Sequence, residues 1–200
     1  MGSAFTQKYR NKLTEKWQEC LKKVGLPCNE VFNFQELYGD NAKMRSWHAN
    51  TLPPDTFSTD GALVIEKQKA KRYCLLIDPQ QLAWSWLRKQ YPQGGPQEVK
   101  IMKMTDSNFY KSLTLAIEGG AFVIIENLPE NPDVHIESLI RREITKSGNN
   151  KMIKFCRRNV KYDNQFRLLM LCNLSRPHFA DNITNHVNSV NFFVTIEGLT

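Results

Sequence analysis

Two different hydrophobic patterns follow one another along the chain and meet near residue 62. In residues 5–24 apolar side chains recur every three or four positions, which predicts an amphipathic helix with one buried face. Gly25, Leu26 and Pro27 end this pattern. Residues 25–62 are interrupted by Pro and Gly and predict ordered irregular chain with one short helix over 40–48. The side chains expected to anchor this segment are Phe32, Phe34, Leu37, Trp47, Leu52 and Phe57.

From residue 62 onward, short apolar runs alternate with helical patterns. Strands are predicted at 73–77, 99–104, 121–125, 166–172 and 190–195, helices at 81–90, 107–118, 134–145 and near 179–188, and a hairpin at 152–162. Strands that are apolar on both sides are typical of a parallel sheet with helices on both faces. The pattern therefore predicts an α/β fold around a mostly parallel sheet of about five strands.

Composition narrows the class of protein. The chain has 200 residues, of which 41% are hydrophobic and 24% charged, as in ordinary globular domains, so collagen-like, disordered and disulfide-scaffold classes are excluded. The apolar runs are far shorter than the roughly 20 residues of a membrane span. Five cysteines without a CxxC pair favour reduced thiols in the cytoplasm. Residues 1–3 are interpreted as an expression scar.

The charge of the chain leaves a second class of function open. The formal net charge is +7, which fits a module that binds nucleic acid or an acidic surface. The Lys and Arg residues are spread over several segments, however, and this distribution favours a solvated basic surface and no nucleic-acid partner. The histidines lack partners at metal-ligand spacing, so no metal site and no catalytic residue is predicted.

The loop after the strand 73–77 lies where an α/β sheet binds phosphate. A working GxxxxGK[ST] loop curls backbone N–H groups around the phosphates, and its Lys and hydroxyl bind phosphate and Mg²⁺. Here Asp78 stands at the first Gly, Ala83 at the second and Trp84 at the Lys, so only Ser85 retains its chemistry. We expect the Trp84 ring to fill the phosphate position. The positions of this degenerate Walker A loop are Asp78, Pro79, Gln80, Gln81, Ala83, Trp84 and Ser85.

The strand 121–125 has the form of a Walker B segment and has lost its chemistry as well. Four apolar residues are followed by Glu126 and Asn127, where Mg²⁺ binding and water activation need Asp followed by Glu. Asn127 carries no charge and cannot act as a general base. Asn173 follows the strand 166–172, where an AAA+ protein has its sensor-1 residue. These two junctions predict a nucleotide-binding geometry without its reactive groups.

Several segments together resemble the fifth AAA+ module of dynein heavy chains, over nearly the whole length after residue 3. The residues that carry the resemblance are Leu76-Ile77-Asp78-Pro79-Gln80, Trp86, Val123-Ile124-Ile125-Glu126-Asn127, Pro177-His178-Phe179 and Val190-Asn191-Phe192-Phe193-Val194-Thr195, with Trp17, Gly25-Leu26-Pro27 and Glu197-Gly198-Leu199. The chain departs from the family pattern at Gln81, where a Gly is usual, and at Asp60, where an Asn is usual.

The resemblance implies a three-layer α/β/α AAA+ large subdomain with a central five-stranded sheet and an N-terminal helical extension. It divides the chain into an extension over 4–61 and the subdomain over 62–200, with the helical lid absent. It implies a non-catalytic structural and mechanical module in the ring of a minus-end-directed microtubule motor, in the cytoskeleton and the cilium axoneme. The implied partners are the neighbouring AAA+ modules, the stalk and buttress, and the linker of the same heavy chain, with microtubules only indirectly.

Two alternatives remain beside this interpretation. One is a divergent AAA+ domain that still binds ADP or ATP with Mg²⁺ as a structural ligand, for which Ser85 and Glu126 are the support. The other is the basic nucleic-acid or acidic-surface module. The preferred expectation is that this part of the chain has no cofactor and no turnover, while the parent heavy chain is a motor ATPase.

Overall fold

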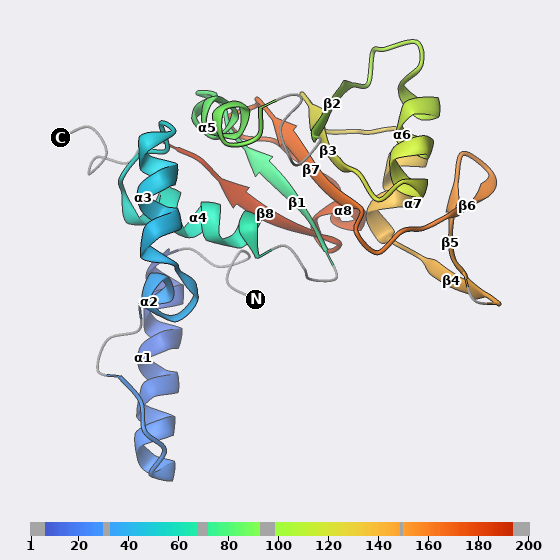
Figure 1. Cartoon of the computed structure of the whole chain (residues 1–200). Coiled ribbons are helices and arrows are strands. Elements are labelled where there is room, and N and C mark those ends of the chain that lie inside the picture. Colours follow the sequence, from blue (N-terminus) through green and yellow to red (C-terminus); the bar gives the residue numbers. More distant parts are fainter. Residues whose placement is uncertain (1–6, 30–32, 68–71, 93–98, 149, 194–200) are drawn as a thin grey trace.

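A five-stranded parallel sheet forms the centre of the protein (Figure 1). The computed structural model describes residues 7–29, 33–67, 72–92, 99–148 and 150–193. Across the sheet the strands are β2 (Val99–Lys103), β3 (Phe122–Glu126), β7 (Arg167–Cys172), β1 (Tyr73–Ile77) and β8 (Val187–Asn191). Five of the six residues of the central strand β7 are buried. The predicted parallel sheet is confirmed.

Helices cover both faces of this sheet, because each strand sends alternate side chains to opposite sides. In β1, Tyr73 and Leu75 belong to one hydrophobic cluster, while Cys74 and Leu76 belong to the other. The first cluster includes α6 (Phe109–Glu118), α7 (Val134–Arg141) and α8 (Asp181–Thr184). The second includes α3 (Asn41–Ala49), α4 (Thr56–Glu66) and α5 (Leu82–Gln90). This arrangement is the expected three-layer fold of an AAA+ large subdomain.

The segment 25–62 differs most from its prediction. The short helix is confirmed as α3, but the segment also contains α2 (Phe34–Tyr38) and most of α4, so the irregular chain predicted there is wrong. The boundary expected between residues 61 and 62 falls inside α4. Of the expected anchors, Trp47 and Leu52 are buried, Phe34 and Phe57 are half-buried, Leu37 is exposed, and Phe32 lies outside the described residues.

Gly61 explains why α4 was missed. A glycine inside a helix costs about 1 kcal/mol relative to alanine, so the sequence pattern treats it as an interruption. In the structure a Cβ at this position would lie 3.0 Å from Val190 Cγ1 and 3.1 Å from Phe192 Cζ. The glycine therefore lets α4 approach the end of β8 closely. Tertiary packing outweighs the local preference of this residue.

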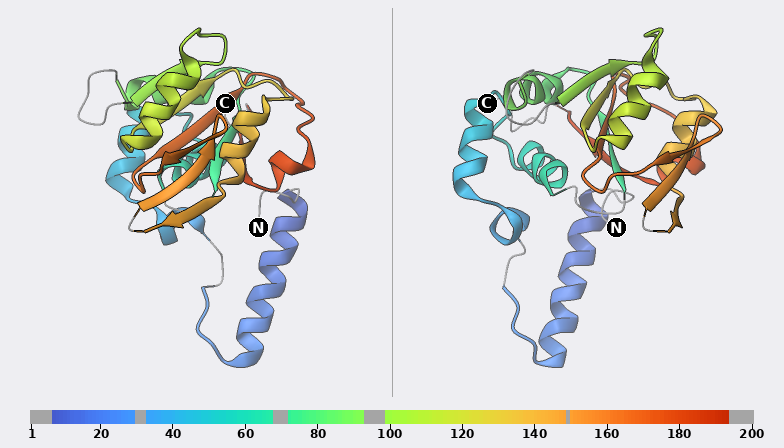
Figure 2. Two further views of the ribbon diagram at one scale, coloured as in Figure 1. Left: turned by 90° about the vertical axis from the view of Figure 1, so that its right-hand side faces the viewer. Right: turned by 45° about the vertical axis from the view of Figure 1, so that its right-hand side comes forward.

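The N-terminal helix α1 (Gln7–Val24) forms as predicted but does not bury the predicted face. None of its described side chains is buried, and Figures 1 and 2 show it running away from the sheet. Its end agrees with the sequence: the N–H of Gly25 donates to the carbonyl of Lys22, and the N–H of Leu26 to that of Leu21. Gly25 has φ +75°, which a Schellman cap requires.

A small antiparallel sheet replaces the expected hairpin. β5 (Asn150–Phe155) and β6 (Arg158–Lys161) form the predicted hairpin, and β4 (Ile144–Ser147) adds a third strand in the order β4-β5-β6. The predicted helix 134–145 includes the first two residues of β4 and is too long. Instead α7 ends at Arg141, and Arg142 follows it with φ +54°. The Arg142 guanidinium lies 5.3 Å from the Tyr73 ring and 5.4 Å from the Tyr162 ring.

The last predicted elements are shifted along the chain. The helix near 179–188 is limited to the four residues of α8, and β8 begins at Val187 instead of residue 190. Two polar residues interrupt β8, so its sequence lacks an apolar run, and the strand forms because Val187 pairs with Tyr73 of β1. Residues 194–195 of the predicted strand lie outside the described residues.

In the part of the chain that the structure describes, no helix has the length and apolar character to cross a membrane.

Candidate functional site

The sequence-predicted site residues meet at one edge of the sheet. Asp78 follows β1, Glu126 ends β3 and is followed by Asn127, and Asn173 follows β7. Because β3, β7 and β1 are parallel neighbours, their carboxyl ends lie side by side. This edge is the position where α/β sheets bind phosphate. The structure therefore brings the two degenerate junctions together.

Asp78 lies at this edge directly after β1, and it is 0% exposed. Its Oδ1 accepts a hydrogen bond from the N–H of Leu82 at 2.8 Å, and its Oδ2 accepts one from the N–H of Trp84 at 2.9 Å. Its own N–H donates to the carbonyl of Cys172 on β7 at 2.9 Å. The first residues of α5 are thus bonded to a carboxylate supplied by the chain itself.

The local backbone makes this geometry possible. Gln81 precedes α5 with φ +58° and makes no side-chain cap, so the cap comes from Asp78 three residues earlier. A helix N-terminus leaves N–H groups free and favours a negative charge, which is why phosphate binds there in nucleotide-binding loops. Here those donors are used by the Asp78 carboxylate. Burial raises the pKa of Asp78, and the N–H groups of Trp84 and Leu82 act in the opposite direction.

The residues of this edge do not fit a nucleoside triphosphate. A phosphate would need the N–H groups that Asp78 holds, and it would approach a buried acidic side chain. The position of the phosphate-binding Lys is taken by Trp84, whose ring is partly exposed with the Arg88 guanidinium 5.5 Å from its centre. Ser85 is exposed, and its hydroxyl donates to the carbonyl of Gln81 at 2.8 Å.

The expectation that the Trp84 ring fills the phosphate position stays a prediction. The side chain that accepts hydrogen bonds from the N–H groups is that of Asp78, and Trp84 donates its own backbone N–H to it. The buried indole of this helix belongs to Trp86, which is 1% exposed and packs edge-on against Trp47 with 5.9 Å between ring centres. An Asp just ahead of a predicted helix is a capping signal, and this signal could have identified the role of Asp78.

The remaining loop positions have structural surroundings. Ala83 is 0% exposed inside the second cluster, Pro79 is half-buried, and Gln80 is exposed. The N–H of Gln81 donates to the carbonyl of Asp78 at 3.2 Å, which closes the turn between β1 and α5. None of these contacts provides a cation for a phosphate.

The Walker B position is similarly engaged with its own chain. Glu126 is half-buried, and its Oε2 lies 3.5 Å from Lys103 Nζ at the end of β2. Asn127 is exposed with φ +51°, a backbone region that Asn adopts more readily than most residues. The N–H of Leu128 then donates to Leu171 on β7. Asn173 is exposed beyond β7. Glu126 thus forms an ion pair with the neighbouring strand β2, and Asn127 begins the connection that follows β3.

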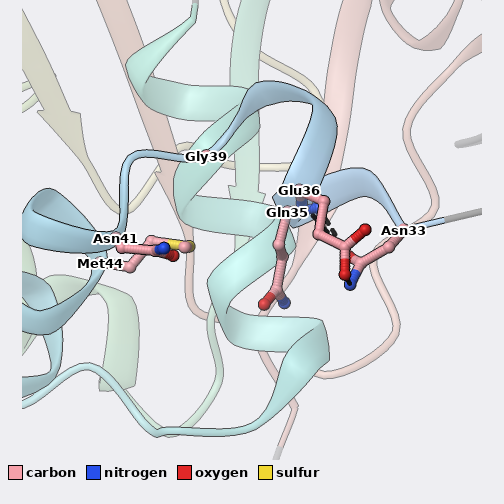
Figure 3. Close-up of a pocket in the computed structure, with 6 residues that line it drawn as sticks. All are labelled: Asn33, Gln35, Glu36, Gly39, Asn41 and Met44. Atoms are coloured by element: carbon pink, nitrogen blue, oxygen red, sulfur yellow. Dashed lines mark hydrogen bonds between the residues drawn. The ribbon is translucent and has the colours of Figure 1, made fainter.

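A separate hollow of ≈ 430 Å³ lies between α2 and α3 (Figure 3). Its polar groups bond mainly to one another: Asn33 Oδ1 accepts from the N–H groups of Gln35 and Glu36, and Asn33 Nδ2 donates to Glu36 Oε1 at 3.1 Å. Gln35 also donates to Asp60 of α4 at 3.1 Å. The hollow is lined by Asn33, Gln35, Glu36, Gly39, Asn41 and Met44, none of which belongs to the predicted site.

Within the described ranges, no three His, Cys, Asp or Glu side chains are grouped as metal ligands would be. The predicted absence of a metal site stays a prediction. The cysteines in these ranges are free thiols, and burial raises the pKa of Cys74 to about 12, which keeps it protonated. Burial also raises the pKa of Cys172, the thiol that ends β7 at the sheet edge.

Comparison with known proteins identifies the family. Residues 45–200 match the family described as the ATP-binding dynein motor region. The chain is 33% identical over 196 residues to human dynein axonemal heavy chain 6, covering 98% of this chain and 5% of the relative. It is 32% identical over 198 residues to the Chlamydomonas reinhardtii dynein-1-alpha heavy chain of the flagellar inner arm I1 complex, covering 98% and 4%. The chain thus spans about a twentieth of the length of these relatives, and it belongs to the family of the ATP-binding dynein motor region.

Proposed function

We propose that this chain is a non-catalytic module in the motor ring of a dynein heavy chain, where it acts as a structural and mechanical element. One observation carries the proposal: the Asp78 carboxylate accepts the two N–H groups at the start of α5 that a phosphate would require. The relatives are heavy chains named as axonemal or flagellar, and this supports a place in the cytoskeleton of a cilium.

The loss of nucleotide binding follows from charge and from competition. Hydrogen bonds to charged groups contribute roughly 1.5–3 kcal/mol each, so an entering phosphate has to displace contacts of that strength. It receives no compensating lysine, because Trp84 stands at that position. The phosphate would also lie close to the buried carboxyl group of Asp78, which is negatively charged like the phosphate when it is ionised. Each of these effects opposes binding of ATP or ADP.

The loss of hydrolysis follows from the second junction. Attack by water on a phosphate needs a carboxylate that holds Mg²⁺ and a second group that orients the water. Glu126 is paired with Lys103 at 3.5 Å, and the neutral Asn127 is exposed. The proposed role is therefore carried by shape and packing, with ATP hydrolysis performed elsewhere in the parent heavy chain.

The two hydrophobic clusters support a mechanical role. They pack helices on both faces of the sheet, and close-packed protein interiors transmit strain. In the proposal, the module passes movements between the neighbouring AAA+ modules, the stalk and buttress, and the linker of the same heavy chain. It acts on microtubules only through them, in minus-end-directed motility.

Calorimetric titration with Mg-ATP and Mg-ADP tests the proposal. We expect no saturable heat up to about 1 mM nucleotide, a concentration that corresponds to only about −4 kcal/mol of binding free energy. Saturation at micromolar nucleotide would contradict the proposal and favour a structural nucleotide. The amide resonances of Leu82 and Trp84 supply a local readout, since phosphate binding has to displace the Asp78 carboxylate from both groups. A longer piece of the heavy chain gives the same test with the following residues in place.

The nucleic-acid alternative has a distinct outcome in a second titration. Binding to duplex or single-stranded nucleic acid through basic residues weakens steeply with salt. We expect no such salt-dependent binding. Its observation would favour the basic binding module over the motor-ring module.

A further inference from the structure

The helix α1 carries an apolar face that the described structure leaves open. Its exposed apolar side chains include Tyr9, Trp17 and Val24, which are 65%, 54% and 73% exposed. Figures 1 and 2 show the helix projecting from the body of the protein. Helices in proteins gain most of their stability from packing of such a face. The geometry points to a surface that another helix covers.

The spacing of these residues is that of a two-helix seam. Leu13, Trp17, Cys20 and Val24 are separated by four, three and four positions, which corresponds to d, a, d and a of a heptad. Leu13 is half-buried and the other three are exposed. Leu21 flanks this seam and is also exposed. We refer to Leu13, Trp17, Cys20 and Val24 as the α1 seam.

The described chain that follows Leu26 makes its hydrogen bonds to α1 at Gln18, outside the seam. After Gly25 the chain turns back along the helix, and it contacts Gln18: the side chain of Gln18 donates to the carbonyl of Asn29 at 3.0 Å, and Cys28 Sγ lies 3.9 Å from the carbonyl of Gln18. Gln18 is at position b of the same heptad, outside the seam. The returning segment therefore occupies a neighbouring side of the helix.

Charge decides what kind of helix fits. The g positions beside the seam are Lys16 and Lys23, both exposed. A second copy of the chain offers no carboxylate to them: in an antiparallel pair each g lysine meets a g lysine, and in a parallel pair it meets Thr14 or Leu21 at position e. We propose that the α1 seam binds an amphipathic helix whose apolar positions are flanked by Glu or Asp. This inference goes beyond the proposed function, because α1 contains none of the degenerate site residues.

The test uses two designed peptides of about three heptads with Leu at a and d, one with Glu and one with Lys at e and g. Binding to the whole chain is followed by fluorescence anisotropy of a label on the peptide. We expect the Glu peptide to bind at least about tenfold more tightly than the Lys peptide, and its affinity to fall as salt rises. Equal binding of the two peptides, or no binding of the Glu peptide, overturns the proposal.

A charge reversal gives the sharpest control. The double variant Lys16→Glu with Lys23→Glu is expected to reverse the preference, so that the Lys peptide binds more tightly. Lys22 lies at position f, away from the seam, so Lys22→Glu changes the charge of the same helix and is expected to keep the original preference. If Lys22→Glu reverses the preference equally, the attraction is a general effect of helix charge and the assignment of the seam is overturned.

Two further readouts locate the contact. Trp17→Glu is expected to abolish binding of the Glu peptide while the main unfolding transition keeps its midpoint, since Trp17 is exposed. Binding is also expected to slow alkylation of Cys20, while Cys156, on the connection between β5 and β6, reacts at an unchanged rate. Unaltered binding by Trp17→Glu, or unaltered alkylation of Cys20, contradicts the proposal. Sedimentation of the chain without peptide tests whether a second copy covers the seam. If the chain dimerises and Trp17→Glu abolishes the dimer, the proposal is overturned in favour of a second copy.

Discussion

The carboxylate of Asp78 caps helix α5 at the position where nucleotide-binding loops bind a phosphate. In nucleotide-binding loops the free N–H groups of the helix bind a phosphate, which the protein has to acquire from solution. Here the N–H groups of Leu82 and Trp84 bind a side chain that is always present. The N–H groups of Leu82 and Trp84 at the start of α5 are therefore satisfied by a carboxylate of the protein itself.

The first prediction concerns this carboxylate. Asp78→Ala leaves two partly buried N–H groups without acceptors and should destabilise the protein by up to about 1–3 kcal/mol for each group that finds no new partner. Asp78→Asn retains one carbonyl acceptor and should cost less. Urea denaturation of the three proteins measures the differences. An unchanged midpoint for Asp78→Ala would show that the cap contributes nothing.

The second prediction separates the two tryptophans of α5. Trp86 is 1% exposed and packs against Trp47, so Trp86→Ala should cost about 3 kcal/mol or more, as for other buried aromatic side chains. Trp84 is partly exposed and should cost clearly less when changed to alanine. Parallel denaturation curves compare the two variants. A larger loss for Trp84→Ala would support the original expectation that its ring fills the phosphate position.

The third prediction uses the pH dependence of Asp133, the cap of α7. The hydroxyl of Tyr110 donates to Asp133 Oδ2 at 2.6 Å, and this bond, followed by the N–H of His135, lowers the pKa of Asp133. Burial, and then Asp133 itself, raises the pKa of Tyr110 to about 12. A lowered carboxyl pKa stabilises the folded state above the ordinary value near 3.9, and this contribution is lost as the pH falls through the lowered pKa.

Tyr110→Phe should therefore raise the pKa of Asp133 toward its ordinary value. Its stability deficit relative to the unmodified protein should be present at neutral pH and shrink in acid. NMR titration of the Asp133 carboxyl, with denaturation at several pH values, measures both effects. A deficit that is constant with pH would mean that Tyr110 acts only through packing.

At the scale of elements, helix α4 depends on close approach to the sheet more than on its own sequence. Gly61 sits in its middle, against Val190 and Phe192, and Phe192 is 0% exposed. A side chain there has to displace atoms that have little room to move. The helix is thus held where local preference is weak, because its neighbours Ala62, Leu63 and Ile65 are buried.

The fourth prediction reverses the usual effect of a glycine substitution in a helix. By helix propensity alone, Gly61→Ala would stabilise α4 by about 1 kcal/mol. Overpacking against β8 costs typically 1–3 kcal/mol, so we expect a net loss of stability. Gly119→Ala provides a second glycine substitution for comparison. Gly119 lies at the end of α6, and a Cβ there would be 3.2 Å from the carbonyl oxygen of Leu115. A stabilised Gly61→Ala would mean that α4 shifts outward at little cost.

At the scale of the whole molecule, stability is distributed unevenly. β7 lies between two strands of the sheet and is almost entirely buried, whereas none of the described side chains of α1 is buried. Backbone groups in such contrasting surroundings open with very different free energies. The described residues therefore form a well-packed body and a helix that buries none of its described side chains.

The fifth prediction follows from this contrast. In native-state hydrogen exchange, amides of β7 should exchange only through global unfolding, and those of α1 should exchange much faster through local opening. Addition of the Glu peptide should slow exchange in α1 and leave β7 unchanged. Protection of α1 equal to that of β7 in the isolated chain would contradict this division of the molecule.

The sequence by itself determined the five strands of the parallel sheet, the helices that follow β1, β2 and β3, and the loss of the residues that a phosphate-binding loop uses. These features are local: continuous apolar runs specify strands buried on both faces, and a missing Lys or Gly is visible without a structure. Only the tertiary structure decided that α4 runs through Gly61, that Val187 starts β8 beside Tyr73, and that the Asp78 carboxylate accepts the N–H groups of Leu82 and Trp84. Each of these depends on atoms brought together from distant elements or across a turn, and such contacts outweigh residue preferences of about 1 kcal/mol.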